Sequence, residues 1–164
     1  MQRTWAPKGK TPILRHSYRR DRLSVIGGLT LSPKRHRLGL YFQIYPWNVT
    51  AVELVQYFTE LLRHLRGEVI VLLDGWAVHK DRKVAEFCRH RRLHLERFPA
   101  YAPELNPQEY VWTQSKRAIS NTSPENRDAL LDLVVNALCD VQQSQTLLGA
   151  CLAQAAKHGL PWND

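Results

Sequence analysis

The pattern of apolar and polar positions predicts a hairpin followed by a helix in the first part of the chain. Residues 22–32 and 37–47 are rich in β-branched and aromatic residues and are separated by the stretch PKRH, which is typical of two antiparallel strands. Residues 48–67 place apolar side chains at helical spacing, with Asn48 or Thr50 as the N-cap.

The rest of the chain alternates strands with helices. Residues 68–76 form a continuous apolar run, which is typical of a strand covered on both faces, and residues 93–99 predict another strand. Helices are predicted at 81–92 and at 106–120, the latter opened by Asn106 and Pro107. Another helix is predicted after a Ser123-Pro124 cap, and a further helical stretch runs to about His158. This order predicts an α/β domain with a mixed sheet and flanking helices.

Composition narrows the class of protein further. A chain of 164 residues with 44% hydrophobic and 23% charged residues fits one globular domain with a sizeable core. No apolar run approaches the roughly 18 residues of a membrane span, and the first residues do not resemble a signal peptide. Three widely spaced cysteines indicate reduced thiols, so we expect a cytoplasmic protein with no membrane partner.

Positive charge is concentrated at the start of the sequence. Residues 1–50 carry ten Lys/Arg and one acid, a balance of +9, and the remaining residues carry thirteen against fourteen, a balance of −1. A basic segment on a near-neutral body indicates a polyanionic partner such as DNA, whose phosphates provide most sequence-independent affinity. A solvated basic surface accounts for the same pattern.

Two carboxylates stand where chemistry is expected. Asp74 follows the apolar run 68–73, at the end of a strand where α/β sheets place their ligand sites, although an acid before Gly75 also suits a turn. Glu109 lies three residues after Asn106, where it forms either a site residue or a capping box. Mg²⁺ takes such hard oxygen ligands, and two ions held by carboxylates catalyse phosphodiester chemistry.

The segments LLDGWAVHK and FPAYAPELNPQEYVW resemble the catalytic core of the mariner-like DDE transposases, especially those of bacterial insertion sequences. Asp74 and His79 match the first family motif. The second motif is matched by Tyr101, Pro103, Leu105, Asn106, Pro107, Glu109 and Trp112. Thirty-four residues separate Asp74 from Glu109, which is the family's spacing, and the resemblance extends over about residues 1–120.

The resemblance implies an RNase H-like fold and a metal-dependent DNA endonuclease and strand transferase. Asp74 and Glu109 would be the second and third catalytic acids and would bind Mg²⁺ or Mn²⁺. The implied partners are transposon ends and target DNA, with a homodimer or pairing with a full-length transposase. Residues 1–122 would form the catalytic core and residues 123–164 a helical extension of it.

The sequence departs from the family pattern in two ways. Gly75 replaces the usual Asn, and no match to the first catalytic Asp, on the family's opening strand, precedes the segment TWAPKGKTP. Asp21 is flanked by arginines and is better explained as a paired turn residue. We therefore expect a truncated core that lacks the first strand and is inactive alone. The alternatives are a non-catalytic DNA-binding remnant, or one of two reading frames that together make the enzyme.

Several further residues are candidates for nucleic-acid contact: Lys8, Lys10, His79, Lys116 and Arg117. Lys116 and Arg117 equally suit a solvated helix face, and His79 equally suits an ordinary loop. A zinc site in CRHRRLH is disfavoured because no second ligand pair stands at zinc spacing. Tyr110 and Trp112 are expected to pack rather than to stack on bases, and Glu104 is expected in an exposed loop.

Overall fold

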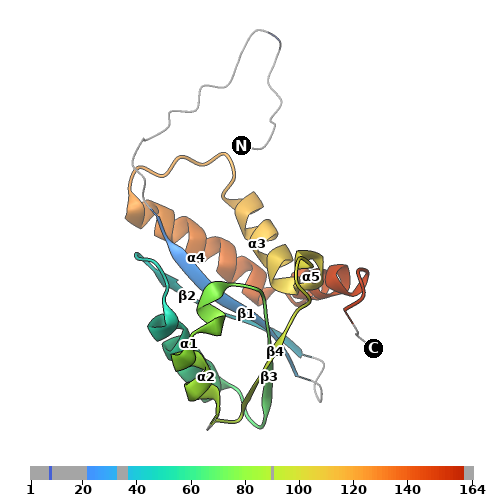
Figure 1. Ribbon diagram of the computed structural model, residues 1–164. Coiled ribbons are helices and arrows are strands. Elements are labelled where there is room, and N and C mark those ends of the chain that lie inside the picture. Colours follow the sequence, from blue (N-terminus) through green and yellow to red (C-terminus); the bar gives the residue numbers. More distant parts are fainter. Residues whose placement is uncertain (1–7, 9–21, 33–36, 90, 161–164) are drawn as a thin grey trace.

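A computed structural model describes residues 8, 22–32, 37–89 and 91–160 (Figure 1). In chain order they form β1 (Ser24–Ser32), β2 (Arg37–Tyr45), α1 (Ala51–His64), β3 (Val69–Leu73), a 3₁₀ turn (Ala77–Lys80), α2 (Arg82–Arg89), β4 (Leu93–Arg97), a 3₁₀ turn (Pro103–Leu105), α3 (Pro107–Ala118), α4 (Arg127–Gln143) and α5 (Gln145–Ala156). No helix in these residues is long and apolar enough to cross a membrane.

The strands pair in two ways. β1 and β2 form the predicted antiparallel hairpin, with Ser24 opposite Tyr45 and Gly28 opposite Tyr41. β3 and β4 are parallel, with Val69 beside Leu93, as expected for strands joined through a helix. Within the described residues these are two two-stranded sheets rather than one continuous mixed sheet.

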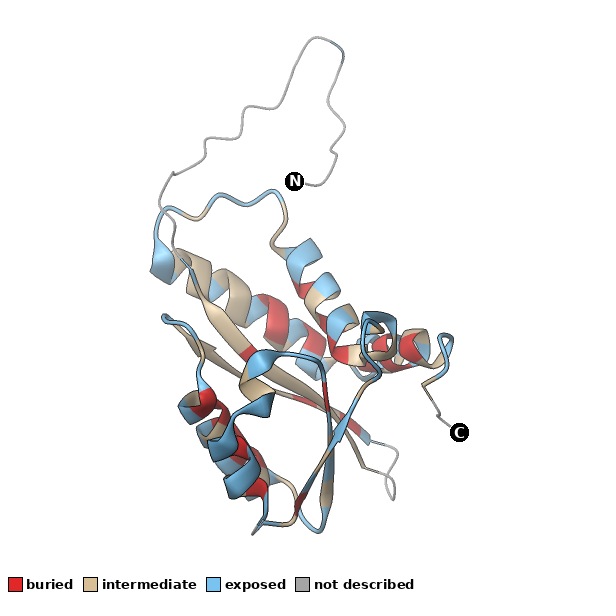
Figure 2. Ribbon diagram, in the orientation of Figure 1, coloured by how far each residue is buried: buried red, intermediate tan, exposed pale blue. Residues whose placement is uncertain are grey.

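The β1–β2 hairpin lies between two layers of helices (Figure 1). Because side chains alternate along a strand, Ile26 and Tyr41 face α1 and join one core, which includes the fully buried Phe58. Leu38 and Leu40 face the opposite way and join a second core with α3, α4 and α5. Figure 2 shows buried residues on α1 and on the three C-terminal helices.

The β3–β4 pair is covered on one face, which corrects the expectation of a strand covered on both. Leu73 is buried and Val71 packs at the edge of the core formed with α1 and α2. Ile70 and Leu72 point the other way and are 69% and 48% exposed. The continuous apolar run therefore contains one buried face and one exposed apolar face.

The helix starts follow the local sequence, with one correction. Thr50 caps α1: its side chain accepts a hydrogen bond from the Val52 N–H, and Glu53 accepts one from the Thr50 N–H at 2.8 Å. α4 begins at Arg127 and is capped by Asn126, whose side chain accepts from the Ala129 N–H at 2.8 Å. The predicted Ser123 cap is wrong because Asn126, three residues later, is itself a strong N-cap residue.

Candidate functional site

Asp74 directly follows β3 and has one carboxylate oxygen already bonded. Its Oδ1 accepts a hydrogen bond from the Trp76 N–H at 2.9 Å, so the residue does form the turn that its sequence context allows. The side chain is 46% exposed, and Oδ2 has no hydrogen-bond partner among the described residues. The turn and an open carboxylate oxygen thus coexist on one side chain.

His79 lies against Asp74. Its Nδ1 is 3.0 Å from Asp74 Oδ1 and 3.3 Å from the Asp74 carbonyl oxygen. The imidazole side chain is only 12% exposed and meets the Trp76 ring edge-on, with the ring centroids 5.2 Å apart. His79 therefore holds the carboxylate in place, which leaves Nε2 as its ring atom for any contact with DNA.

Glu109 lies in the first turn of α3, and its carboxylate is free. Asn106 caps this helix by accepting from the Gln108 N–H at 3.0 Å. The Asn106 N–H donates to the Pro103 carbonyl oxygen at 3.0 Å, so the capping-box explanation of Glu109 is wrong. Within the described part of the chain the Glu109 carboxylate has no partner, and it stands at the amino end of α3.

The strand topology relates the two acids. β3 and β4 are parallel, so their carboxyl ends share one edge, and the Phe98 N–H extends this pairing to the Leu73 carbonyl at 2.9 Å. Asp74 directly follows β3 at that edge. The segment after β4 starts at the same edge and leads into α3, which carries Glu109. No direct contact joins Asp74 to Glu109, and the described residues contain no group of three or more His, Cys, Asp or Glu that could hold a metal ion.

The other predicted contacts are exposed but dispersed. Lys116 and Arg117 lie in the last turn of α3, about 11–12 Å along the helix axis from Glu109. Lys8 is exposed, whereas Lys10 and Asp21 lie outside the described residues. Glu104 is exposed as expected, and its carbonyl oxygen accepts from the Tyr110 hydroxyl at 3.0 Å.

One residue beside Glu109 escaped the sequence analysis. Gln108 is only 8% exposed, and neither its Oε1 nor its Nε2 has a hydrogen-bond partner in the described residues. It shares the buried face of α3 with Val111 and Ser115, at the spacing of successive turns. Trp112 packs beside this face close to Gly27, which confirms its packing role. The sequence signal that could have revealed Gln108 is its spacing from Val111 and Ser115, which places a polar residue on the buried face of the helix.

The cysteines show no sign of a site. Burial raises the pKa of the Cys88 and Cys151 thiols, which disfavours the thiolate that metal binding or nucleophilic attack requires. Cys88 packs in the core beneath α1, and Cys151 packs in the second core beneath β2. Both behave as small apolar residues.

Comparisons with known proteins identify the family of the chain. Residues 1–131 of the 164 match the family model described as DDE superfamily endonuclease, and the chain belongs to that family. It is similar to the Tc1 transposase of Caenorhabditis elegans, with 30% identity over 64 residues, which is 39% of this chain and 23% of the relative.

Solved structures of Mos1 transposase share the fold. The paired-end complex with the left transposon end matches with a TM-score of 0.68 and 15% identity over 96% of this chain and 48% of that chain. The Mos1 mariner paired end complex with Mn gives 0.68 and 14% identity, over 95% of this chain and 48% of that chain. The Mos1 catalytic domain gives 0.53 and 13% identity over 81% of each chain. These likenesses establish the RNase H-like fold, and this chain spans about half of the Mos1 chain in the paired-end complexes.

Proposed function

We propose that this chain supplies two catalytic carboxylates, Asp74 and Glu109, to a transposase that cuts and joins DNA with the help of divalent metal ions. One observation carries the proposal. Asp74 directly follows β3, Glu109 opens α3, and both retain carboxylate oxygens without a partner among the described residues. Membership of the DDE superfamily endonuclease family supports the same chemistry.

The donor set fits Mg²⁺ or Mn²⁺. Both ions take hard carboxylate oxygens and keep several waters, so two acids make a partial but chemically suitable site. The bonds from the Trp76 N–H and His79 fix the Asp74 carboxylate, which lowers the cost of ordering it around an ion. A bound pair of such ions would activate the attacking water or 3′-hydroxyl and stabilise the leaving oxygen.

DNA is the proposed substrate and partner. The solved Mos1 complex contains a transposon end, and this chain carries a net charge of +8 that suits a polyanion. Lys116 and Arg117 are exposed on the helix that presents Glu109, where they would contact phosphates beside the reacting bond. Pairing with a second copy or with a full-length transposase would bring two DNA ends together.

A second candidate function is DNA binding without catalysis. The described residues hold no group of three acids, and two carboxylates alone hold two ions poorly. We therefore expect this polypeptide by itself to bind DNA and metal weakly and to leave phosphodiester bonds intact.

Metal binding and DNA cleavage, measured separately, test the proposal. Titration of Mn²⁺ followed by electron paramagnetic resonance should show a weak site in the unaltered protein that Asp74→Asn or Glu109→Gln removes. Asp128→Asn, an exposed acid in the first turn of α4, is the matched control and should leave it unchanged. Mn²⁺ binding indifferent to Asp74→Asn would contradict the assignment of the site. Nicking of supercoiled plasmid that depends on Asp74 would contradict inactivity alone.

A further inference from the structure

The end of the molecule opposite Asp74 carries a cluster of arginines. α1 and α2 pack side by side and both end near the amino ends of β3 and β4 (Figure 1). A cavity of about 470 Å³ lies there, lined by Thr59, Leu62, Arg63, Phe87, Arg91 and Arg92. Arg66 and Arg89 are exposed at the ends of the same two helices. Residues after position 50 are near-neutral as a whole, so this gathering of arginines is local.

Arg92 is held firmly by the end of α1. Its guanidinium donates to the carbonyl oxygens of Leu62, Leu65 and Gly67. Leu62 and Leu65 lie at the end of α1, where carbonyls lack backbone partners, and Gly67 lies just beyond it, so capping by itself explains this side chain. Three of its five N–H donors are occupied in this way, which leaves two for a ligand.

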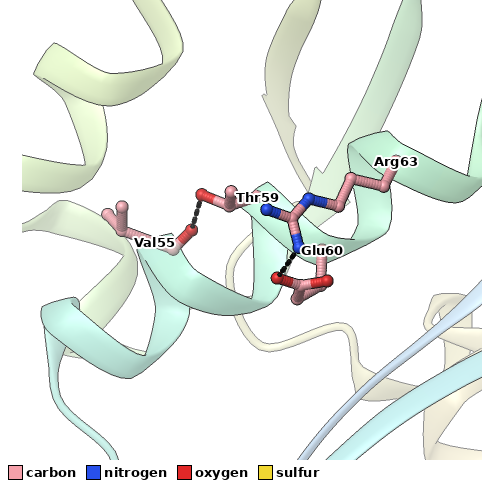
Figure 3. Close-up of polar contacts among 4 residues, drawn as sticks. All are labelled: Val55, Thr59, Glu60 and Arg63. Carbon is pink, nitrogen blue, oxygen red and sulfur yellow. Dashed lines mark hydrogen bonds and ion pairs between the residues drawn. The ribbon is translucent and has the colours of Figure 1, made fainter.

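Arg63 and Arg91 have no such structural duty. The Arg91 guanidinium carbon lies 5.2 Å from the centroid of the Phe87 ring. This cation–π contact orients the planar guanidinium group. Arg63 makes one ion pair, with Glu60 at 2.7 Å, between side chains that are 69% and 44% exposed (Figure 3). A pair this exposed contributes little to stability, so Arg63 is available to another anion.

The nearby acids do not neutralise the positive charge of the cluster, and the nearby hydroxyl is already hydrogen-bonded. Glu60 offsets one of the three lining arginines, which leaves a balance of +2 around the cavity. Glu68 is bonded to His94 at 2.8 Å, and Glu86 to Arg82 at 2.7 Å. The Thr59 hydroxyl donates to the Val55 carbonyl at 2.8 Å, so the arginines are the donors that a ligand would meet (Figure 3).

We infer that this arginine cluster, Arg63, Arg91 and Arg92, is a second contact for the DNA phosphate backbone, remote from the carboxylates. Guanidinium forks match phosphate oxygens in geometry and charge. β3 has five residues, so its two ends are about 16 Å apart, or about five base pairs of duplex. Duplex extending beyond the reacting bond would reach the cluster. The inference rests on the proposed function, in which DNA is the ligand. It adds a contact that does not depend on the DNA sequence.

The salt dependence of DNA binding tests the inference. Binding of the full chain to a fluorescent duplex of about 30 base pairs is measured by anisotropy at several salt concentrations. The double variant Arg63→Ala/Arg91→Ala should weaken binding about tenfold and lower the slope of log Kd against log salt by about two. Arg92 is left unchanged because it caps α1. Arg127→Ala/Lys157→Ala removes the same charge from α4 and the end of α5 and should change the slope little.

Hydrogen exchange of the unaltered protein gives a readout without mutation. Added duplex should slow exchange at the ends of α1 and α2, around residues 60–66 and 87–93. Equal slopes for the two double variants, or DNA binding without protection at these segments, would overturn the inference while leaving the proposed function intact. If Asp74→Asn loses Mn²⁺ binding while hydrogen exchange at the arginine cluster is not slowed by duplex, the proposed function stands and this inference fails. Failure of the unaltered protein to bind duplex would overturn both.

Discussion

The two strand pairs of this molecule are built from similar apolar residues and are buried very differently. The β1–β2 hairpin lies between α1 on one side and α3, α4 and α5 on the other. Among the described residues the β3–β4 pair packs on α1 and α2, and its far face exposes Ile70 and Leu72. The burial of an apolar strand is therefore set by how many helix layers reach it, and not by its own hydrophobicity.

The difference bears on function as well as on stability. The doubly covered hairpin packs against α3, and α3 presents Glu109. The singly covered pair presents Asp74 at one end and adjoins the arginine cluster at the other. In the part of the chain that the structure describes, β3 and β4 pair only with each other, and an exposed apolar sheet face with such open edges invites pairing with another strand.

The largest expected effect comes from one leucine truncation in each strand pair. Leu40→Ala, at a side chain only 1% exposed in β2, should lower the free energy of unfolding by about 2–5 kcal/mol through lost burial and a cavity. Leu72→Ala, at 48% exposure in β3, should cost less than about 1 kcal/mol. Urea denaturation measures both, and equal losses would show that the far face of β3 is covered.

A smaller effect is expected from adding one carbon at two glycines. A Cβ on Gly27 in β1 would lie 2.6 Å from Trp112 Cη2, so Gly27→Ala should cost about 1–3 kcal/mol as the indole shifts. A Cβ on Gly75 after β3 meets nothing within 4 Å, so Gly75→Ala should change stability by less than about 0.5 kcal/mol. Thermal unfolding of the two variants in parallel distinguishes them. A large loss in the second would reveal packing around Asp74.

Gln108 offers a stabilising change in the doubly covered region. Its amide is buried without a hydrogen bond among the described residues, and Met has a similar length without polar atoms that need partners. Gln108→Met should raise the free energy of unfolding by about 1 kcal/mol. Gln114→Met, on a less buried face of α3, controls for helix propensity. A loss of stability in Gln108→Met would mean that the amide has a polar partner.

The smallest effect concerns α1, the helix that both strand pairs share. Hydrogen bonds from Thr50 lower the pKa of Glu53 from the ordinary 4.5 to about 2. A depressed pKa in the folded state stabilises the fold above the ordinary value, and this contribution is lost as the pH falls towards about 2. Glu53→Gln should therefore be less stable than the parent at neutral pH, and the difference should vanish near pH 2. Denaturant titrations across this range check it, and a difference independent of pH would exclude the ionised cap.

Much of the fold was predictable because it depends on neighbouring residues. The hairpin follows from two β-rich runs around PKRH, and α3 starts where Asn106 and Pro107 indicate. The start of α4 was misplaced because Ser123-Pro124 and Asn126 both carry capping signals within four residues. The position of Asp74 at the end of a strand was predictable for the same local reason. That Glu109 is free of the capping box was not, because this depends on where the Asn106 N–H donates.

The sequence by itself determined the order of the elements, the turn residues and the placement of Asp74 and Glu109 at the ends of their elements. These follow from side-chain periodicity and capping, which act over a few residues. Only the tertiary structure decided that one face of β3 stays exposed, that Gln108 is buried, and that Arg63, Arg91 and Arg92 line one cavity. Each of these depends on packing between elements far apart in the chain, where the burial of one surface is set by what the others leave uncovered.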